Sequence, residues 1–317
     1  MGNGYRTAFA ATAYYKTDAL WRNNHKNRRF KPMPAFTNQA TLRYNDTVTN
    51  SNIVSGEVVG VISATKTALV DLYGPNDSLT YVVSIVNSGT APYTGLVVND
   101  DLGGYPFGQD GTLYPLSYVA GSLLYLVDGT AQPTPVVDGG PPLQISGINL
   151  PAGSNATLIY QAETTQYAPL APQSTINNTV TVSGGGLSTP VTAEETVAIR
   201  DDANLTITKG ISPVPVAENG RLTYTFVIQN QGNTAAVATD NLVVTDTFDP
   251  ILSGLTVTLD GVTLVEGTDY TYNAATGEFA TVAGRITVPA ATVVQDSTTG
   301  VWGLTPGAAT LTVSGTV

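Results

Sequence analysis

The sequence predicts an all-β protein made of two immunoglobulin-like (Ig-like) β-sandwiches in tandem. Three observations support this prediction: a composition dominated by Thr, Val and Gly, short runs of alternating apolar and polar residues, and an internal repeat. β-Branched residues fit a pleated sheet and lose rotamer freedom in a helix. Turn signals recur about every 8–12 residues, which is typical of antiparallel sandwiches. The 317 residues suffice for two such domains.

The internal repeat is clearest around two lysines. Residues 66–87 read KTALVDLYGPNDSLTYVVSIVN, and residues 209–230 read KGISPVPVAENGRLTYTFVIQN. Each copy has a Lys, then a Leu-Thr-Tyr strand, then an Asn-x-Gly turn. Farther on, V-V-N-D at 97–100 matches V-V-T-D at 243–246. Because a repeated strand order predicts a repeated fold, each copy is expected to form one sandwich.

The repeat divides the chain into four expected parts. Strand alternation assigns the core face of the first copy to Leu79, Tyr81, Val83 and Ile85. The expected parts are a basic N-terminal extension at 1–35, a donor strand and linker at 36–60, Ig-like domain 1 at 61–199, and Ig-like domain 2 at 200–317.

The expected extension at 1–35 differs in charge from the rest of the chain. It has seven basic residues and one acid, a formal +6, whereas the remainder has six basic and 23 acidic residues, a net −17. A basic arm can bind nucleic acid, an anionic surface or the acidic body of a like subunit, or it can be a flexible, solvated terminus. Nucleic-acid binding is the weakest of these interpretations, because no recognised binding motif accompanies the charges.

Composition also excludes several kinds of chemistry. The chain has no Cys and a single His, His25, which lies in the basic extension. A Cys nucleophile, a disulfide and a zinc finger are therefore excluded. No phosphate-loop motif is present and no apolar run is long enough to span a bilayer. We expect no cofactor, no metal site, no membrane span and no enzymatic activity.

The repeated motif resembles a known family. A Lys strand, then L-T-Y-x-x-x-I-x-N-x-G, then V-V-x-D is similar to the bacterial surface repeat catalogued as domain of unknown function eleven. The resemblance covers most of residues 36–317. It implies tandem Ig-like modules in long surface or fibre proteins, mostly of Gram-positive bacteria, without enzymatic turnover.

The two copies are not equally complete in the sequence. Copy one ends in a strand at 176–182, I-N-N-T-V-T-V, for which copy two has no counterpart before Val317. Residues 36–42, F-T-N-Q-A-T-L, match that strand, so that Asn38 corresponds to Asn178. One face of the expected donor strand carries Phe36, Asn38, Ala40, Leu42 and Tyr44.

A missing strand at one end of a chain and a spare strand at the other predict assembly. A sandwich without its last strand exposes unpaired backbone groups and an apolar groove. Donation of the spare strand to the next copy would give a head-to-tail polymer. Three alternatives stay open: the strand folds back onto its own second domain, the chain is an excerpt of a longer one, or the match is chance.

The lysines suggest covalent chemistry. Beyond residue 31 the only lysines are Lys66 and Lys209, at equivalent places in the repeat. A Lys, an Asn and an acid on neighbouring strands are the ingredients of a spontaneous isopeptide bond, because burial favours the neutral amine and the protonated acid. We expect a bond within domain 1 from Lys66, Asp100 and Asn178, and a bond between subunits from Lys209, Asp246 and Asn38. The simpler alternative is a Lys–Asp ion pair or two solvated lysines.

The expected function is a structural subunit that polymerises with identical copies into an extracellular, pilus-like fibre or spore appendage on a bacterial cell or spore surface. The absence of an apolar signal segment near Met1 favours either assembly inside a sporulating cell or a processed chain. The alternative is an adhesin stalk or wall-associated module that binds a cell-surface or host ligand. A carbohydrate-active β-sandwich would need an acid pair in a cleft, and the low charge content disfavours it.

Overall fold

A computed structural model describes the backbone of residues 35–44, 47–57, 60–109 and 111–317. Apart from Ala35, the basic extension lies outside the described residues. The described residues form β-strands and one short 3₁₀ helix, Ala238–Asp240. None of the described helical structure has the length and apolarity needed to cross a bilayer. The chain divides into two compact units, 1–60 and 61–317, and the second holds two separate hydrophobic cores. The all-β sandwich prediction is confirmed.

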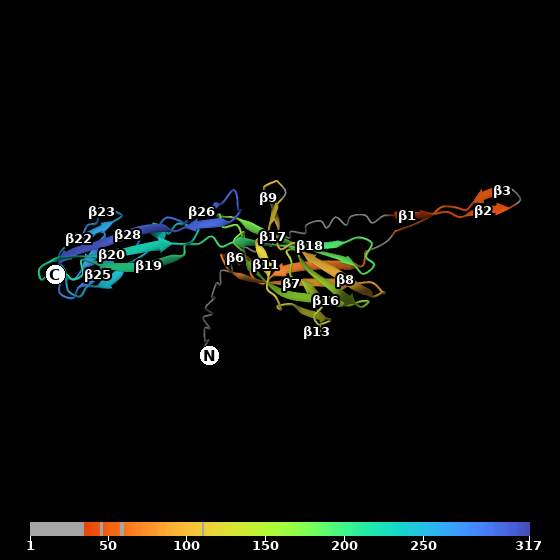
Figure 1. Cartoon of the computed structure of the whole chain (residues 1–317), viewed down its shortest axis with the longest axis horizontal. Coiled ribbons are helices and arrows are strands. Elements are labelled where there is room, and N and C mark those ends of the chain that lie inside the picture. The colour runs from red at the N-terminus through yellow and green to blue at the C-terminus, as the bar shows by residue number, and fades with distance from the viewer. Residues whose placement is uncertain (1–34, 45–46, 58–59, 110) are drawn as a thin grey trace, which may run out of the picture. The chain divides into compact units, whose positions relative to one another are not determined.

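The first sandwich consists of two six-stranded sheets (Figure 1). One sheet has the order β13-β12-β16-β7-β5, with β11 also paired to β16; the other has the order β14-β15-β8-β17-β18-β6. A small β9–β10 hairpin stands apart from both. The bounds are β5 Ile62–Ala68, β6 Leu72–Tyr73, β7 Ser78–Asn87, β8 Tyr93–Asp100, β9 Tyr105–Phe107, β10 Gly111–Leu113, β11 Leu116–Tyr118, β12 Leu124–Val127, β13 Thr130–Ala131, β14 Val136–Asp138, β15 Leu143–Leu150, β16 Asn155–Thr164, β17 Thr175–Gly184 and β18 Val191–Ile199.

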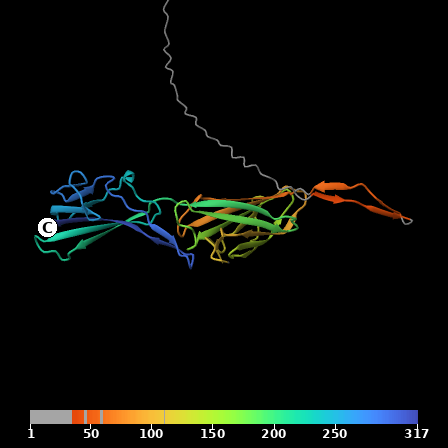
Figure 2. The ribbon, with the colours of Figure 1, turned by 90° about the horizontal axis from the view of Figure 1, so that it is seen from above.

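The core of this sandwich follows the alternation of its strands. Strand β7 buries every second residue, and the four residues predicted for its core face, Leu79, Tyr81, Val83 and Ile85, are all fully buried. Strands β16 and β17 alternate in the same way. Figure 2 shows strands of the two sheets facing each other across this core. Hydrophobic side chains removed from water on these inner faces supply the main stabilising free energy.

The second sandwich repeats only part of this plan. Its larger sheet has the order β19-β20-β28-β22-β23, and its smaller sheet has three strands, β21-β25-β24. A β26–β27 hairpin forms a separate ladder. The bounds are β19 Leu205–Ser212, β20 Arg221–Asn230, β21 Thr245–Thr247, β22 Ser253–Leu259, β23 Val262–Thr263, β24 Tyr270–Tyr272, β25 Glu278–Thr281, β26 Thr292–Gln295, β27 Trp302–Thr305 and β28 Gly307–Thr316.

Comparison of the two sheet orders shows what the second sandwich lacks. Strand β8 pairs with β15 on one edge and β17 on the other. Its counterpart β21 pairs with β25, and within the described residues its other edge has no strand partner. No described strand of this sandwich takes the place of β17 or β18.

The unit at 1–60 contains a long β-hairpin rather than the single strand that we expected at 36–42. Strands β1 (Ala35–Asn38) and β4 (Val54–Glu57) pair with each other, and β2 (Thr41–Tyr44) pairs with β3 (Thr47–Asn50) (Figure 1). Residues 39 and 40 interrupt the first strand, although the Ser51 amide still donates to the Ala40 carbonyl at 2.9 Å. The backbone of the expected donor is therefore paired locally.

The repeated Asn-x-Gly motif has a structural role. Asn87 is fully buried at the end of β7, where its Nδ2 donates to the carbonyls of Ala91 and Pro151 at 2.9 Å each. Its Oδ1 accepts from the Gly89 amide at 3.0 Å. Asn230 makes the same kind of set in the second sandwich. The motif thus satisfies backbone groups that the turn leaves without ladder partners.

We predict that Asn87→Ala destabilises the first sandwich by about 3 kcal/mol, because it leaves buried backbone donors and acceptors unsatisfied. Urea unfolding monitored by tyrosine fluorescence measures the change. Asn99→Ala is the control, since the hydrogen bond from Gln144 that it removes is exposed. Equal effects of the two substitutions would contradict this role for Asn87.

Candidate functional site

Lys66 and Asp100 form a buried ion pair inside the first sandwich. Lys66 lies on β5 and Asp100 at the end of β8, so the pair joins the two sheets across the core. The Nζ–Oδ2 distance is 2.9 Å, and the side chains are 0% and 1% exposed. The other carboxylate oxygen, Oδ1, accepts from the Leu102 amide at 2.9 Å. Two of the three residues predicted for this site therefore lie in contact.

Asn178 is the third predicted member, and it reaches the same region from β17. Asp100 pairs in register with Val180, and Asn178 lies two residues away on the same face of β17. β17 also packs against β5, the strand of Lys66. Asn178 is fully buried, and within the described part of the chain neither its Oδ1 nor its Nδ2 has a hydrogen-bond partner. An unsatisfied buried polar group costs about 1–3 kcal/mol, so its retention in a core calls for an explanation.

The cluster also contains two tyrosines, Tyr160 and Tyr81, which the sequence did not assign to it. The Tyr160 hydroxyl donates to Asp100 Oδ2, the oxygen that also contacts Lys66. The Tyr81 ring lies under the amine, with Lys66 Nζ 4.8 Å from the ring centroid. The Tyr81 hydroxyl lies beside the Asn178 carboxamide without a well-formed hydrogen bond. The repeated Leu-Thr-Tyr motif was the available signal for Tyr81, whereas Tyr160 has no repeated counterpart.

Burial changes the acid–base chemistry of the cluster. Removal from water lowers the pKa of Lys66, and the nearby Asp100 carboxylate opposes that effect. Burial also raises the pKa of Tyr160, and the negative charge of Asp100 adds to the increase. The lowered Lys66 pKa increases the fraction of neutral amine, which is the nucleophilic form. The tyrosine stays protonated and can hold the carboxyl group in place.

The second sandwich has the same Lys–Asp pair in a much more exposed setting. Lys209 on β19 contacts Asp246 on β21, but the side chains are 41% and 18% exposed. The amine lies over the Tyr224 ring, 4.4 Å from its centroid. Tyr224 thus corresponds to Tyr81. In the β28 register, Val313 stands where Tyr160 stands in the first sandwich.

The described residues of the second sandwich contain no equivalent of Asn178. The predicted partner, Asn38, ends β1 in the unit at 1–60 and pairs there with Val54. Asn38, Ala40 and Leu42 are all exposed in that hairpin. The side chains of Phe36 and Tyr44 lie outside what the structure describes. The Lys209–Asn38 link therefore stays a prediction.

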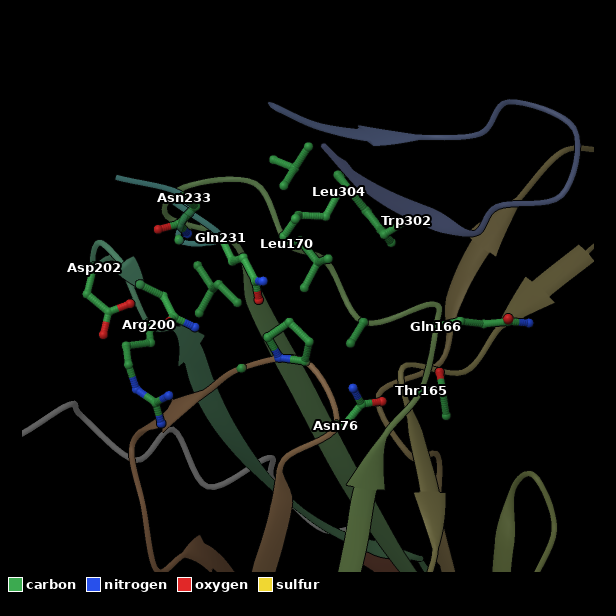
Figure 3. A pocket seen from close by; sticks show the side chains of 17 residues that line it. Asn76, Thr165, Gln166, Leu170, Arg200, Asp202, Gln231, Asn233, Trp302 and Leu304 are labelled. Carbon is green, nitrogen blue, oxygen red and sulfur yellow. The ribbon is translucent and has the colours of Figure 1, made fainter. Parts of the chain in front are cut away.

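A cavity of about 490 Å³ lies between the two sandwiches of the 61–317 unit. Figure 3 shows polar residues of both sandwiches around it, with Trp302 and Leu304 of β27 on one side. Direct bonds cross the same joint: the Trp302 amide donates to the Gln166 carbonyl at 3.0 Å, and Gln295 Nε2 donates to the Tyr105 hydroxyl at 2.9 Å. We interpret the region as a packed joint between the sandwiches.

The different exposure of the two lysines predicts different reactivity. An amine-acylating reagent applied to the native monomer should modify Lys209 and leave Lys66 unmodified, because acylation needs access to the neutral amine. Peptide mapping by mass spectrometry measures both sites. In the Asn178→Ala variant Lys66 has no amide to react with, so its modification by the reagent depends on burial alone. Modification of both lysines at similar rates in that folded variant would contradict the buried position of Lys66.

Comparison with known proteins gives a likeness of fold only. No protein-family model and no curated protein matches the sequence. Among solved structures, the chain is similar to BcpA, the major pilin subunit of Bacillus cereus, at 12% identity over 77% of this chain and 74% of that one, with a TM-score of 0.32. A variant of the same pilin matches at 10% identity with a TM-score of 0.34, over 73% of this chain and 58% of that one. The pilus backbone RrgB of Streptococcus pneumoniae matches at 11% identity over 77% of this chain and 55% of that one, with a TM-score of 0.31.

Proposed function

We propose that this chain is the structural, non-enzymatic subunit of an extracellular bacterial fibre that assembles head to tail by β-strand donation. A single observation carries the proposal: one chain contains a closed sandwich and an open version of the same sandwich. The first sandwich buries its Lys–Asp pair under β17 and β18. The second leaves the equivalent pair exposed beside a strand edge without a partner in the described residues.

The unit at 1–60 offers what the open sandwich needs. Its β1–β2 segment contains Asn38, Ala40 and Leu42, which correspond in sequence to Asn178, Val180 and Val182 of β17. Addition of this strand to the free edge of β21 would extend the backbone ladder. Burial of Leu42 in the groove would contribute roughly 1.5–3 kcal/mol. Donor and acceptor lie on different surfaces of the chain, so repeated donation produces an open polymer.

The buried cluster supports a covalent bond within the first sandwich. In the proposed reaction a proton first passes from the Lys66 ammonium group to the Asp100 carboxylate within the ion pair. The neutral Nζ then attacks Cγ of Asn178, while the Asp100 carboxyl group donates a hydrogen bond to the amide oxygen. The bond from Cγ to Nδ2 breaks after a proton passes from the attacking nitrogen to Nδ2 through the carboxyl group. The products are one isopeptide bond and one ammonia molecule, with no oxidant or reductant. Because the Asn178 side chain has no hydrogen-bond partner among the described residues, its carboxamide is available for attack.

The same reaction between subunits would link Lys209 of one copy to Asn38 of the next, with Asp246 in the place of Asp100. Covalent links along the fibre would make it resistant to detergent and heat. We place the fibre on a cell surface or a spore surface, and we propose membership of the family of domain of unknown function eleven on the repeated motif described above. An adhesin stalk is the competing function, and discrete rods in place of filaments would favour it.

Intact mass spectrometry tests the bond within the first sandwich. The monomer should be lighter than its sequence by the mass of one ammonia molecule, and Lys66→Ala or Asn178→Ala should each restore the full mass. Asn177→Ala is the matched control, since this neighbouring side chain on β17 is exposed and should not affect the reaction. An unmodified mass for the wild-type monomer would rule out the bond.

Negative-stain electron microscopy tests the assembly. The wild-type chain should form filaments, and deletion of residues 36–60 should abolish them while the first sandwich stays folded. Lys209→Ala should still form filaments, but these should dissociate in hot detergent. A monomer that has lost two ammonia molecules would show that the strand is donated within its own chain, and the polymer model would then be wrong.

A further inference from the structure

In the first sandwich the edge of β8 is covered by a hairpin, β17–β18, and not by a single strand. β17 pairs with the edge of β8, and β18 pairs with β17 along its whole length. β18 also packs across β5, the strand that carries Lys66, and buries Val197 and Ile199 in the core. Glu195, the register partner of Asn178, lies close enough to Lys66 to interact with it electrostatically. The second strand of the hairpin therefore helps to cover the amine.

In the second sandwich the surface that β18 would cover is open. Seven of the eight residues of β19 are exposed, whereas the equivalent strand β5 alternates and buries Lys66. Ile207 and Ile211 on β19 are 54% and 49% exposed. Addition of one strand to the edge of β21 would fill the place of β17, but it would leave β19 without the cover that β18 provides.

The hairpin at 35–57 is similar in length to the β17–β18 hairpin. Asn38 faces Val54, sixteen residues farther along, and Asn178 faces Glu195, seventeen residues farther along. Each hairpin also directly precedes a strand that carries a repeat lysine: β4 precedes β5, and β18 precedes β19. Val54 therefore stands opposite the donor asparagine, as Glu195 stands opposite Asn178.

The two faces of this hairpin differ in their fit to the open sandwich. Val54 shares the face of Asn38 because the two residues are register partners. Ser55, the next residue of β4, pairs with Thr37 and lies on the opposite face. Val54 is 53% exposed, and Ser55 is exposed as well. The face that carries the asparagine thus also presents an apolar side chain from the second strand.

We propose that the whole hairpin β1–β4 of one copy docks on the second sandwich of another copy, with β1–β2 on the free edge of β21 and β3–β4 across β19. This inference rests on the proposed function and extends it, because the second strand becomes part of the interface. Val54 takes the position that Glu195 has over Lys66 and covers Lys209 with apolar surface. Docking of the second strand thereby excludes water from the lysine before the bond to Asn38 forms.

Three aspartate substitutions in the full chain test this inference. Val54→Asp would bury a carboxylate in the docked hairpin and should lower the yield of filaments and of detergent-resistant multimers at least about tenfold. Ser55→Asp is the matched control, because this neighbouring residue of β4 is exposed and lies on the opposite face, and it should assemble like the wild type. Leu42→Asp, on the first strand, should abolish assembly. All three positions are exposed in the monomer, and circular dichroism checks that each variant is folded.

The outcomes separate this inference from the proposed function. Normal assembly of Val54→Asp together with failure of Leu42→Asp would show that only one strand is donated, which overturns the inference and leaves strand donation intact. Normal assembly of Leu42→Asp would overturn strand donation itself. Failure of Ser55→Asp would contradict one-sided docking and overturn the inference as well.

Discussion

The ion pair between Lys66 and Asp100 is the interaction on which the design of the first sandwich depends. A lysine with a fully buried side chain needs a partner, because desolvation of an isolated ammonium group is very unfavourable. Asp100 provides that partner from the opposite sheet, and Tyr160 donates to the same carboxylate oxygen. The pair also requires cover from β17 and β18, since neither β5 nor β8 alone would exclude water from it. The Lys66–Asp100 pair therefore stays buried only when all the strands of the sandwich are in place.

The second sandwich shows the same pair without that cover. Lys209 and Asp246 still meet, and the amine still lies over a tyrosine ring, yet the lysine side chain is 41% exposed. Solvent screens the attraction between the charges of a partly exposed pair. The two sandwiches therefore present two states of one arrangement within a single chain. Completion by a β-hairpin is the physical change that would convert one state into the other.

The hairpin at 35–57 takes part in both the proposed assembly and the proposed bond to Lys209. Its inner backbone groups are paired within the hairpin, while Leu42, Val48, Ile53 and Val54 are exposed. Apolar residues presented on a two-stranded ribbon gain little stability from the ribbon itself. These apolar residues would gain stability by packing on a surface like the one that β17–β18 covers. Donation of a prefolded hairpin also requires less ordering than donation of an unfolded strand, which reduces the entropy cost of docking.

Sequence alone determined the fold class, the repeat and the identity of Lys66, Asp100 and Asn178, because strand alternation and a twofold repeat encode which residues face a core. It did not determine that Tyr160 joins the cluster, since that contact depends on how β16 packs opposite β8. It also suggested one donor strand where the structure has a hairpin, because Val54 meets Asn38 only through the register of two strands. The exposure of Lys209 was likewise decided by tertiary structure: burial depends on which strands cover a residue, and local sequence does not specify that cover.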